Sequence, residues 1–418
     1  MTHREPELAR ITRQGASTDG STDAVAITDF IHMSFGVTNS YLVTTADRSV
    51  VVNAGSEQEA RRAHLPRYRR IDRRPPAYII TTQSHRDHMG GVPVLSGPDT
   101  RWVAHESSTR WRADVRMLHD VYLRRRNVLW SSVLNDVVEL GNRAGPDRDA
   151  DIGVGDSWET EVGGRRFELL ATPGGETTDS LVVWLPDDGA VFTSNLFGPV
   201  FGGMPNLATL RGDKLRSARQ FISSLERVRD LEPELLITGH GDPIRGAGTI
   251  RAALDRIRDA IQYVHDRTVE GMLAGESLAE VMAEAEPPED LRLLEAHGKA
   301  SWNARSIWHE YLGWFLMEST TELYPVPASS VAADLVELAG ASELTNRART
   351  HLDEGRPVEA LHLTDMVLHA GPGDRGALAV RKDALQELLE RSRGENLSEV
   401  MWLRSQISDT ERRLADER

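Results

Sequence analysis

The chain has 418 residues, with 49 Lys and Arg against 64 Asp and Glu, a formal net charge of −15, and no cysteine. At ~100 to 200 residues per domain, this length indicates two or three domains, each able to bury a core. The lack of cysteine excludes disulfide frameworks, thiolate-bound zinc, iron–sulfur clusters and thiol catalysis. The acidic balance argues against a nucleic-acid-binding protein, which usually carries a basic face. No apolar signal segment and no run of about 18 apolar residues is present, so we expect a cytoplasmic protein without a membrane span.

In the first part of the chain, short β-rich runs alternate with helical patterns. Residues 1–24 are rich in Ser, Thr, Asp and Gly and are predicted to form a flexible arm. Helical patterns begin at Glu57 and cover 106–128 and 213–231. The alternation favours α/β layering. The predicted strands are 31–35, 39–45, 49–55, 77–82, 100–104, 165–172, 180–185, 190–194 and 234–239.

Beyond about residue 250 helical periodicity continues to the C-terminus. The stretch 343–372 is similar to one tetratricopeptide-like hairpin with a turn at Gly355, but no second copy follows at a ~34-residue period. We therefore interpret this part as antiparallel helices at a domain or subunit interface. A set of aromatic residues at helical spacing is predicted to be core rather than a substrate wall. This set is Trp302, Trp308, Tyr311, Trp314 and Phe315.

The segment Thr81–Gly91, TTQSHRDHMGG, carries the clearest chemical pattern. It places His85, Asp87 and His88 directly after a predicted buried strand, where loops often carry functional sites. Imidazole nitrogen and carboxylate oxygen are ligands for zinc and iron. We therefore predict a metal site here rather than a structural loop.

This motif resembles that of the metallo-β-lactamase superfamily, Thr-His-x-His-x-Asp-His-x-Gly-Gly, with Gln83 in place of the first histidine. Further segments resemble that family in the same order. They are NSYLVTTADRSVVVNAG, with Asn53 where the family usually has aspartate, then ATPGGETTDS, VFTSN, and LLITGHGDP, which contains His240.

Within the superfamily the chain is most similar to the alkylsulfatases. Glu176 follows Thr-Pro-Gly after one residue, and PNLATLRG (205–212) resembles a segment of that group. YVHDRTVEGMLAGESLAEVM, EPPEDL and SWNARSIWHEYLGWF resemble its dimerisation region. The resemblance implies an α/β fold: an αββα sandwich over 25–265, followed by an all-α dimerisation domain over 266–418 that forms a homodimer. The group's C-terminal sterol-carrier-like domain is not expected in this chain.

The resemblance also implies two zinc sites. Gln83, His85 and Glu176 would form the first, and Asp87, His88 and His240 the second. Asn195 would lie between them, where the family has a bridging carboxylate, and a metal-bound hydroxide would be the nucleophile. Amide oxygen is a poor zinc ligand, so the first site is the weaker one and one or two zinc ions are expected, with iron or manganese as alternatives.

We expect a metal-dependent hydrolase that cleaves an alkyl or aryl sulfate ester or a similar small anionic ester, with Asp87 in the catalytic set. Arg211, with Thr209, is the candidate for binding the sulfate group. Alternatively, Arg211 forms a structural salt bridge. Asn206 offers a further donor or is a plain turn residue. The alternatives are the same fold with a mono-metal or iron-dependent reaction, and a catalytically degenerate metal-binding dimer.

Two arginine-rich segments have no assigned role. They are Arg61–Arg74 and Arg110–Arg126. We interpret both as solvated faces of surface helices rather than as phosphate-binding grooves, and Arg86 likewise as a solvated side chain.

Overall fold

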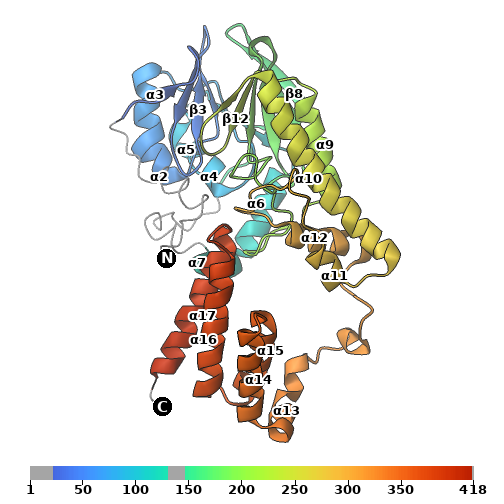
Figure 1. The fold of residues 1–418 in the computed structure, drawn as a ribbon. Coiled ribbons are helices and arrows are strands. Elements are labelled where there is room, and N and C mark those ends of the chain that lie inside the picture. The colour runs from blue at the N-terminus through green and yellow to red at the C-terminus, as the bar shows by residue number, and fades with distance from the viewer. Residues whose placement is uncertain (1–21, 130–145, 417–418) are drawn as a thin grey trace. The chain divides into compact units, whose positions relative to one another are not determined.

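The computed structural model describes residues 22–129 and 146–416 (Figure 1). It divides into two compact units. The larger comprises Glu7–Asn127 and Ser131–Tyr311, and the smaller is formed mainly by Leu312–Arg418. The boundary expected at residues 265 and 266 falls inside the helix α10 (Ala247–Ala274), whereas the compact units divide after Tyr311. Most of the expected N-terminal arm, residues 1–24, lies outside the described residues.

The larger unit contains two β-sheets, in agreement with the predicted α/β fold. Their strand orders are β1-β2-β3-β4-β5-β6-β7 and β13-β12-β11-β10-β9-β8. The strands are β1 (Val25–Ala26), β2 (Ile31–Ser34), β3 (Ser40–Val43), β4 (Val50–Val52), β5 (Tyr78–Ile80), β6 (Arg101–His105), β7 (Ile152–Val154), β8 (Ser157–Val162), β9 (Arg165–Ala171), β10 (Leu181–Leu185), β11 (Ala190–Ser194), β12 (Leu235–Thr238) and β13 (Ile244–Arg245). All nine predicted strands are present, and β7, β8 and the short β1 and β13 were not predicted.

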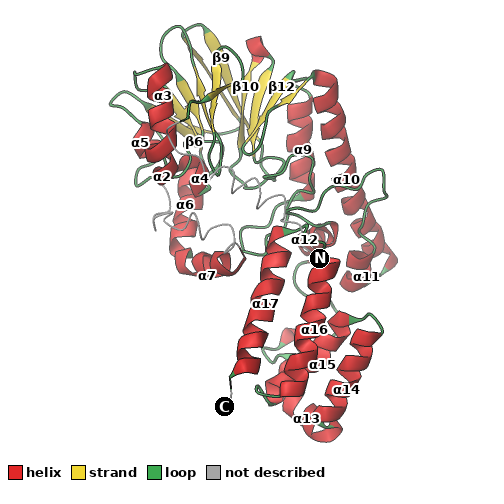
Figure 2. Cartoon of the chain, turned by 60° about the vertical axis from the view of Figure 1, so that its left-hand side comes forward, coloured by secondary structure: helices red, strands yellow, loops and turns green. Residues whose placement is uncertain are grey.

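The two sheets pack face to face because alternate residues of each strand are apolar on the inner side. Val50 and Val52 of β4 and Phe192 of β11 belong to one buried core between the sheets. Val51 and Trp102 instead pack on the outer side, against the neighbouring helices. Figure 2 shows helices α3 and α5 on one side of the strands and α9 and α10 on the other. The unit is therefore an αββα sandwich.

The helices of this unit differ in detail from the sequence expectation. The helix predicted over 106–128 is broken at Leu118, and the one predicted over 213–231 begins only at Ala218, where the Ser217 hydroxyl accepts from the Gln220 backbone amide. The helices are α2 (Glu57–Glu59), η1 (Ala60–His64), α3 (Leu65–Ile71), α4 (Arg86–Met89), α5 (Val92–Leu95), α6 (Ser108–Met117), α7 (His119–Leu129), η2 (Pro186–Asp188), α9 (Ala218–Arg229), α10, α11 (Leu278–Ala283) and α12 (Ala300–Leu312).

The smaller unit is helical. It contains η3 (Thr320–Leu323), η4 (Ala328–Val331), α13 (Ala332–Ala339), α14 (Ala341–Asp353), α15 (Pro357–Ala370), α16 (Arg375–Arg391) and α17 (Leu397–Ala415). The predicted turn at Gly355, with φ of 77°, joins α14 and α15. Small residues such as Ala348, Ala360 and Ala384 are fully buried between these helices, which lets them approach closely. No helix in the described part of the chain is long and apolar enough to cross a membrane.

Two expectations about surface and core are wrong. Trp308 is buried, but Tyr311 and Trp314 are 45% and 67% exposed. Tyr311 lies in the exposed last turn of α12, and Trp314 lies beyond the end of the helix at Leu312, where the helical spacing no longer applies. The arginine-rich segments are only partly solvated. Arg67 and Arg112 are buried, and their guanidinium groups donate to backbone carbonyls such as Phe35 O and Pro146 O.

Candidate metal centre

The predicted ligands lie in loops that follow the carboxyl ends of strands. β5 leads into the segment with Asp87 and His88, and His88 lies in the single-turn helix α4. β11 ends at Ser194 just before Asn195, and β12 ends two residues before His240. Because β11 and β12 are parallel neighbours, their ends meet at one edge of the sandwich. The chain therefore brings distant segments together at this edge.

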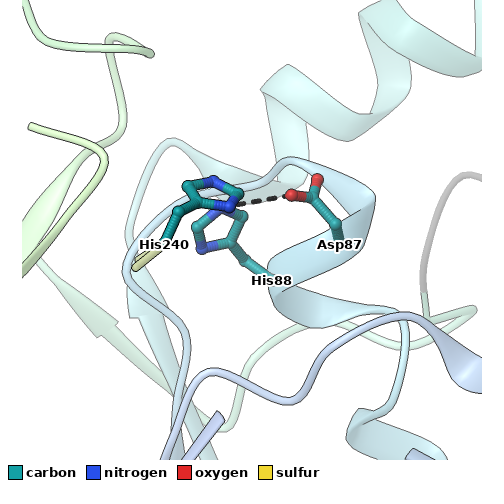
Figure 3. A group of neighbouring side chains, drawn as sticks. All are labelled: Asp87, His88 and His240. Atoms are coloured by element: carbon teal, nitrogen blue, oxygen red, sulfur yellow. Dashed lines mark ion pairs between the residues drawn. The ribbon is translucent and has the colours of Figure 1, made fainter. Parts of the chain in front are cut away.

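Asp87, His88 and His240 form a compact cluster (Figure 3). Their ligand atoms all lie within 4.8 Å of one another, and Asp87 Oδ2 is 3.5 Å from His88 Nε2. In the described part of the chain, this is the one group of three or more His, Asp or Glu side chains with such spacing. Two imidazoles and a carboxylate are a donor set that suits a divalent metal with an open coordination position. These residues fit a metal.

Hydrogen bonds fix both imidazole rings of the cluster. His240 Nδ1 donates to the backbone carbonyl of Val37, and His88 Nδ1 lies 3.1 Å from the hydroxyl of Ser194. Each bond engages Nδ1 and so leaves Nε2 as the ligand atom, which is how metal-binding histidines are usually oriented. The Thr38 hydroxyl donates to Asp87 Oδ2. Partners outside the cluster thus orient all three side chains.

Burial sets the protonation states of the cluster. It lowers the pKa of His88 to about 3 and also lowers the pKa of His240, so both rings are neutral at pH 7. Burial alone would raise the pKa of Asp87, but the neighbouring histidines and the Thr38 hydroxyl lower it overall. The cluster therefore offers two neutral imidazoles and one carboxylate, the forms that bind a metal.

Glu176 and His85, expected at the first metal site, instead contact arginine, histidine and glutamine side chains. Glu176 Oε1 lies 2.7 Å from His297 Nε2, and Oε2 lies 3.2 Å from Arg216 Nη2. His85 Nε2 is 3.2 Å from Arg211 Nη2, and its Nδ1 is 3.0 Å from Gln83 Nε2. These side chains do not join the cluster of Asp87, His88 and His240.

The cationic side chains are held by a second carboxylate, Asp213. Its Oδ2 lies 3.3 Å from Arg216 Nη2, 3.6 Å from Arg211 Nη2 and 3.5 Å from His85 Nε2. Burial would raise the pKa of Glu176, but Arg216 and then His297 lower it well below its usual value. Both carboxylates are therefore ionised inside the structure. We call Glu176, Asp213, Arg211, Arg216 and His297 the Glu176 network.

Several buried oxygens beside the cluster have no hydrogen-bond partner. They are Gln83 Oε1, Asn195 Oδ1, Asn206 Oδ1 and Thr209 Oγ1. Leaving such atoms unsatisfied is costly, so each of them is available to a polar ligand. Asn195 Nδ2 lies 3.2 Å from His88 Nε2, and Asn206 Nδ2 lies 3.2 Å from His297 Nε2. The candidate sulfate-binding residues Asn206 and Arg211 thus both contact members of the Glu176 network, Asn206 through His297 and Arg211 at Glu176.

Sequence reasoning missed Asp213, Arg216, His297 and the ring-orienting Ser194. Asp213 and Arg216 follow closely after the PNLATLRG segment. Their closeness to this segment is the sequence feature that could have indicated a place in the site. His297 comes from a loop before α12, and no local pattern links it to Glu176, more than a hundred residues earlier. Only the folded chain brings the two together.

Comparisons with known proteins agree with the fold. The model of the family described as the metallo-beta-lactamase superfamily matches residues 33–240, and that of alkyl sulfatase dimerisation matches residues 277–404. The chain is 26% identical over 325 residues to a linear primary-alkylsulfatase of a Pseudomonas strain, covering 72% of this chain and 60% of that protein. It is 22% identical to an alkyl/aryl-sulfatase of Saccharomyces cerevisiae, covering 77% of this chain and 53% of that protein. The chain thus spans little more than half the length of these relatives.

A solved structure has the same fold. The stereoselective inverting sec-alkylsulfatase Pisa1 from Pseudomonas sp. superposes with a TM-score of 0.78 at 21% identity, covering 98% of this chain and 69% of that chain. The two family matches follow one another along the chain in the order that the sequence motifs predicted. The chain belongs to the metallo-β-lactamase superfamily, in its alkylsulfatase-like group.

Proposed function

We propose that the protein is a metal-dependent hydrolase that cleaves an alkyl or aryl sulfate ester, or a similar small anionic ester. One observation carries the proposal: the cluster of Asp87, His88 and His240 lies beside a loop that presents Arg211. The names of the relatives, alkylsulfatases and an alkyl/aryl-sulfatase, support the same reaction.

The roles of the side chains follow from their chemistry. Asp87, His88 and His240 would hold a divalent metal, which would supply Lewis acidity and a hydroxide at neutral pH. Arg211 offers a planar guanidinium fork to the sulfate oxygens, and its side chain is 27% exposed, so an incoming anion can reach it. Thr209 and Asn206 add uncharged polar groups to the same loop. The cationic loop therefore orients the sulfate group toward the cluster.

We propose that the chain binds one zinc ion, through Asp87, His88 and His240. The first predicted site, with Gln83, His85 and Glu176, is not expected to hold a second zinc, because Glu176 pairs with Arg216 and His85 contacts Arg211. Asn195, an amide, replaces the carboxylate that would bridge two metals. The guanidinium groups thus take over positive charge that a second metal would supply.

A second candidate function rests on the same observation. A site with one metal and a cationic network also suits a single-metal reaction with iron or manganese in place of zinc-dependent hydrolysis. The two candidates make different predictions about metal content and turnover.

Elemental analysis and an ester panel test both candidates. Purified protein loaded with zinc should bind about one equivalent and hydrolyse short alkyl or aryl sulfates, and Asp87→Ala should lose both properties. Full zinc occupancy with no turnover of any sulfate or related ester would reject the first candidate. Two tightly bound zinc ions per chain would reject the single-metal assignment.

We also propose that the protein works in the cytoplasm as a homodimer formed through its helical C-terminal part, without a nucleic-acid partner. The region matched by the dimerisation family includes a run of exposed apolar side chains. Trp314 is 67% exposed, Met317 83%, and Leu338 85%. Large apolar side chains exposed within this region favour a protein interface.

Light scattering measures the assembly. A Trp314→Ser, Met317→Ser double variant should become a monomer at micromolar concentration. Leu273→Ser, at a single exposed leucine (84%) in α10 and outside this run, serves as the matched control and should leave the dimer intact. A monomeric parent protein would contradict the proposal.

A further inference from the structure

The short loop between β2 and β3, residues 35–39, contacts two of the three proposed metal ligands. Its Val37 carbonyl accepts the hydrogen bond from His240 Nδ1, and its Thr38 hydroxyl donates to Asp87 Oδ2. Asp87 and His240 come from widely separated parts of the chain, on different sheets. The position of the loop therefore helps to set how these two ligands lie relative to each other.

The side chain that holds this loop is Glu59, the last residue of α2. Glu59 Oε1 accepts a hydrogen bond from the Val37 backbone amide, and Oε2 accepts one from the Ser56 backbone amide at 2.9 Å. Val37 is thus bonded at both of its backbone polar atoms, through N to Glu59 and through O to His240. A carboxylate suits this role because each of its two oxygens can accept from a different backbone amide.

Gly36 shows how closely the loop packs against Glu59. A Cβ atom on Gly36 would lie 3.0 Å from Glu59 Oε1, 3.1 Å from His64 Cε1 and 2.7 Å from the carbonyl oxygen of Thr38. These spacings leave no room for a side chain, so the loop backbone lies directly on the helix that carries Glu59. The contact is therefore part of the packing and not a chance approach of a surface side chain.

The chain segment just before Glu59 is bonded to the third proposed ligand. The Ala54 backbone amide donates to the carbonyl of His88 at 2.7 Å, and the Gly91 amide donates to the carbonyl of Gly55 at 2.9 Å. Glu59 thus joins the loop that contacts the other two ligands to the segment that holds His88.

We propose that Glu59 is a positioning residue for the metal centre, acting through the loop 35–39 on Asp87 and His240. This inference rests on the metal ligands assigned in the proposed function. Without Glu59 the ligands remain in the chain, but the loop loses the bond that fixes it, so the metal is held more weakly and in an altered geometry. Hydrogen-bonding partners around a metal site commonly contribute about 10- to 100-fold to its affinity.

The zinc affinity of the full chain, measured by competition with a chelator, tests this inference without requiring turnover. Glu59→Ala should bind zinc about 10- to 100-fold more weakly than the parent protein. Glu280→Ala is the matched control, because Glu280 forms the same capping box with Ser277 at the start of α11 as Glu59 forms with Ser56. It should keep the affinity of the parent. Urea unfolding of the metal-free proteins verifies that each variant is folded.

The cobalt(II) form provides a second measurement, since its visible absorption spectrum reports the geometry of the ligands. The spectrum should change in Glu59→Ala and superimpose on that of the parent in Glu280→Ala. Loss of a helix cap alone would lower the stability and leave the spectrum unchanged. Glu59→Gln, which fills the same volume and keeps one acceptor oxygen, should lie between parent and Glu59→Ala. It provides the comparison if Glu59→Ala does not fold.

The outcomes separate this inference from the proposed function. Equal zinc affinity and identical cobalt spectra for the parent and Glu59→Ala overturn the inference even if alkyl sulfates are hydrolysed. Weakened zinc binding in Glu59→Ala, in a protein that hydrolyses no sulfate ester, rejects the proposed reaction and leaves the positioning role standing. A parent protein that binds no zinc, or an Asp87→Ala variant that keeps its zinc, overturns both the metal assignment and the inference.

Discussion

Replacing Glu176 by glutamine separates a network carboxylate from a metal ligand. The carboxylate lies 2.7 Å from His297 Nε2 and 3.2 Å from Arg216 Nη2, and the Arg216 side chain is only 1% exposed. Removing one partner of a buried ion pair costs about 3 to 5 kcal/mol. Here Asp213, 3.3 Å from Arg216, remains as a partial substitute. We therefore expect Glu176→Gln to lower the free energy of unfolding by about 2 to 3 kcal/mol.

The effect should depend on pH in a defined direction. The pKa of Glu176 is lowered well below its ordinary value of 4.5, so its contribution to stability is fully present above that value. The contribution is lost as the pH falls from 4.5 through the lower pKa of the folded state. The difference between wild type and Glu176→Gln should thus be constant from pH 8 to 6 and shrink in acid.

Urea unfolding followed by tryptophan fluorescence, with elemental analysis at each step, measures both quantities. Glu168→Gln is the matched control, since Glu168 is 31% exposed and lies 3.9 Å from Arg166. A surface pair of this kind contributes at most about 1 kcal/mol. If Glu176→Gln keeps its stability but loses one of two zinc ions, Glu176 is a metal ligand and the reasoning fails.

Three further predictions concern the cluster and its support. Ser194→Ala, which removes the partner of His88 Nδ1, should weaken zinc binding about 10- to 100-fold in a competition assay with a chelator; unchanged affinity would show that Ser194 does not orient the ring. Gly91→Ala should cost at least about 2 kcal/mol in urea unfolding, because its Cβ would lie 2.1 Å from Ala54 O, whereas Gly248→Ala, with open space around it, should be neutral or stabilising; equal effects would contradict the steric argument. Burial, and then Arg67, lower the pKa of His64 to about 3, so the unfolded chain takes up a proton below pH 6.5 that the folded chain excludes. This histidine should therefore cost about 2 kcal/mol of stability between pH 7 and pH 5, a loss absent from His64→Gln; identical pH dependence in both proteins would refute it.

The sequence predicted the sandwich and the cluster well because both depend on local patterns. Alternating apolar residues located the inner strands, such as Val50–Val52, and the spacing of Asp87 and His88 identified one side of the metal centre. The resemblance supplied His240, which lies about 150 residues away. Each of these features is visible within a short window or through a known family pattern.

The Glu176 network could not be predicted in the same way. Its members come from three separated segments of the chain. Whether Glu176 binds a metal or a guanidinium depends on which side chains the fold places within contact distance of its carboxylate. Arg216 and His297 do so from positions that no periodicity connects. Likewise, Arg67 and Arg112 belong to charged runs typical of a solvated face. Both are nevertheless buried, because backbone carbonyls accept hydrogen bonds from their guanidinium groups. At these positions, residues distant in the sequence determine what each side chain contacts.

The hydrogen bond from His240 to the carbonyl of Val37 has a consequence for the protein's synthesis. Asn39 N also donates to Gly239 O at 2.8 Å, so the last ligand is secured by the earliest part of the sandwich. At ~5 to 20 residues per second, a ribosome that has added His88 needs about 8 to 30 s more to reach His240. During that interval the nascent chain has only two of the three proposed ligands, so tight metal uptake should follow release of the last strand from the ribosome tunnel. Tight metal binding would then occur only after the whole sandwich has been synthesised.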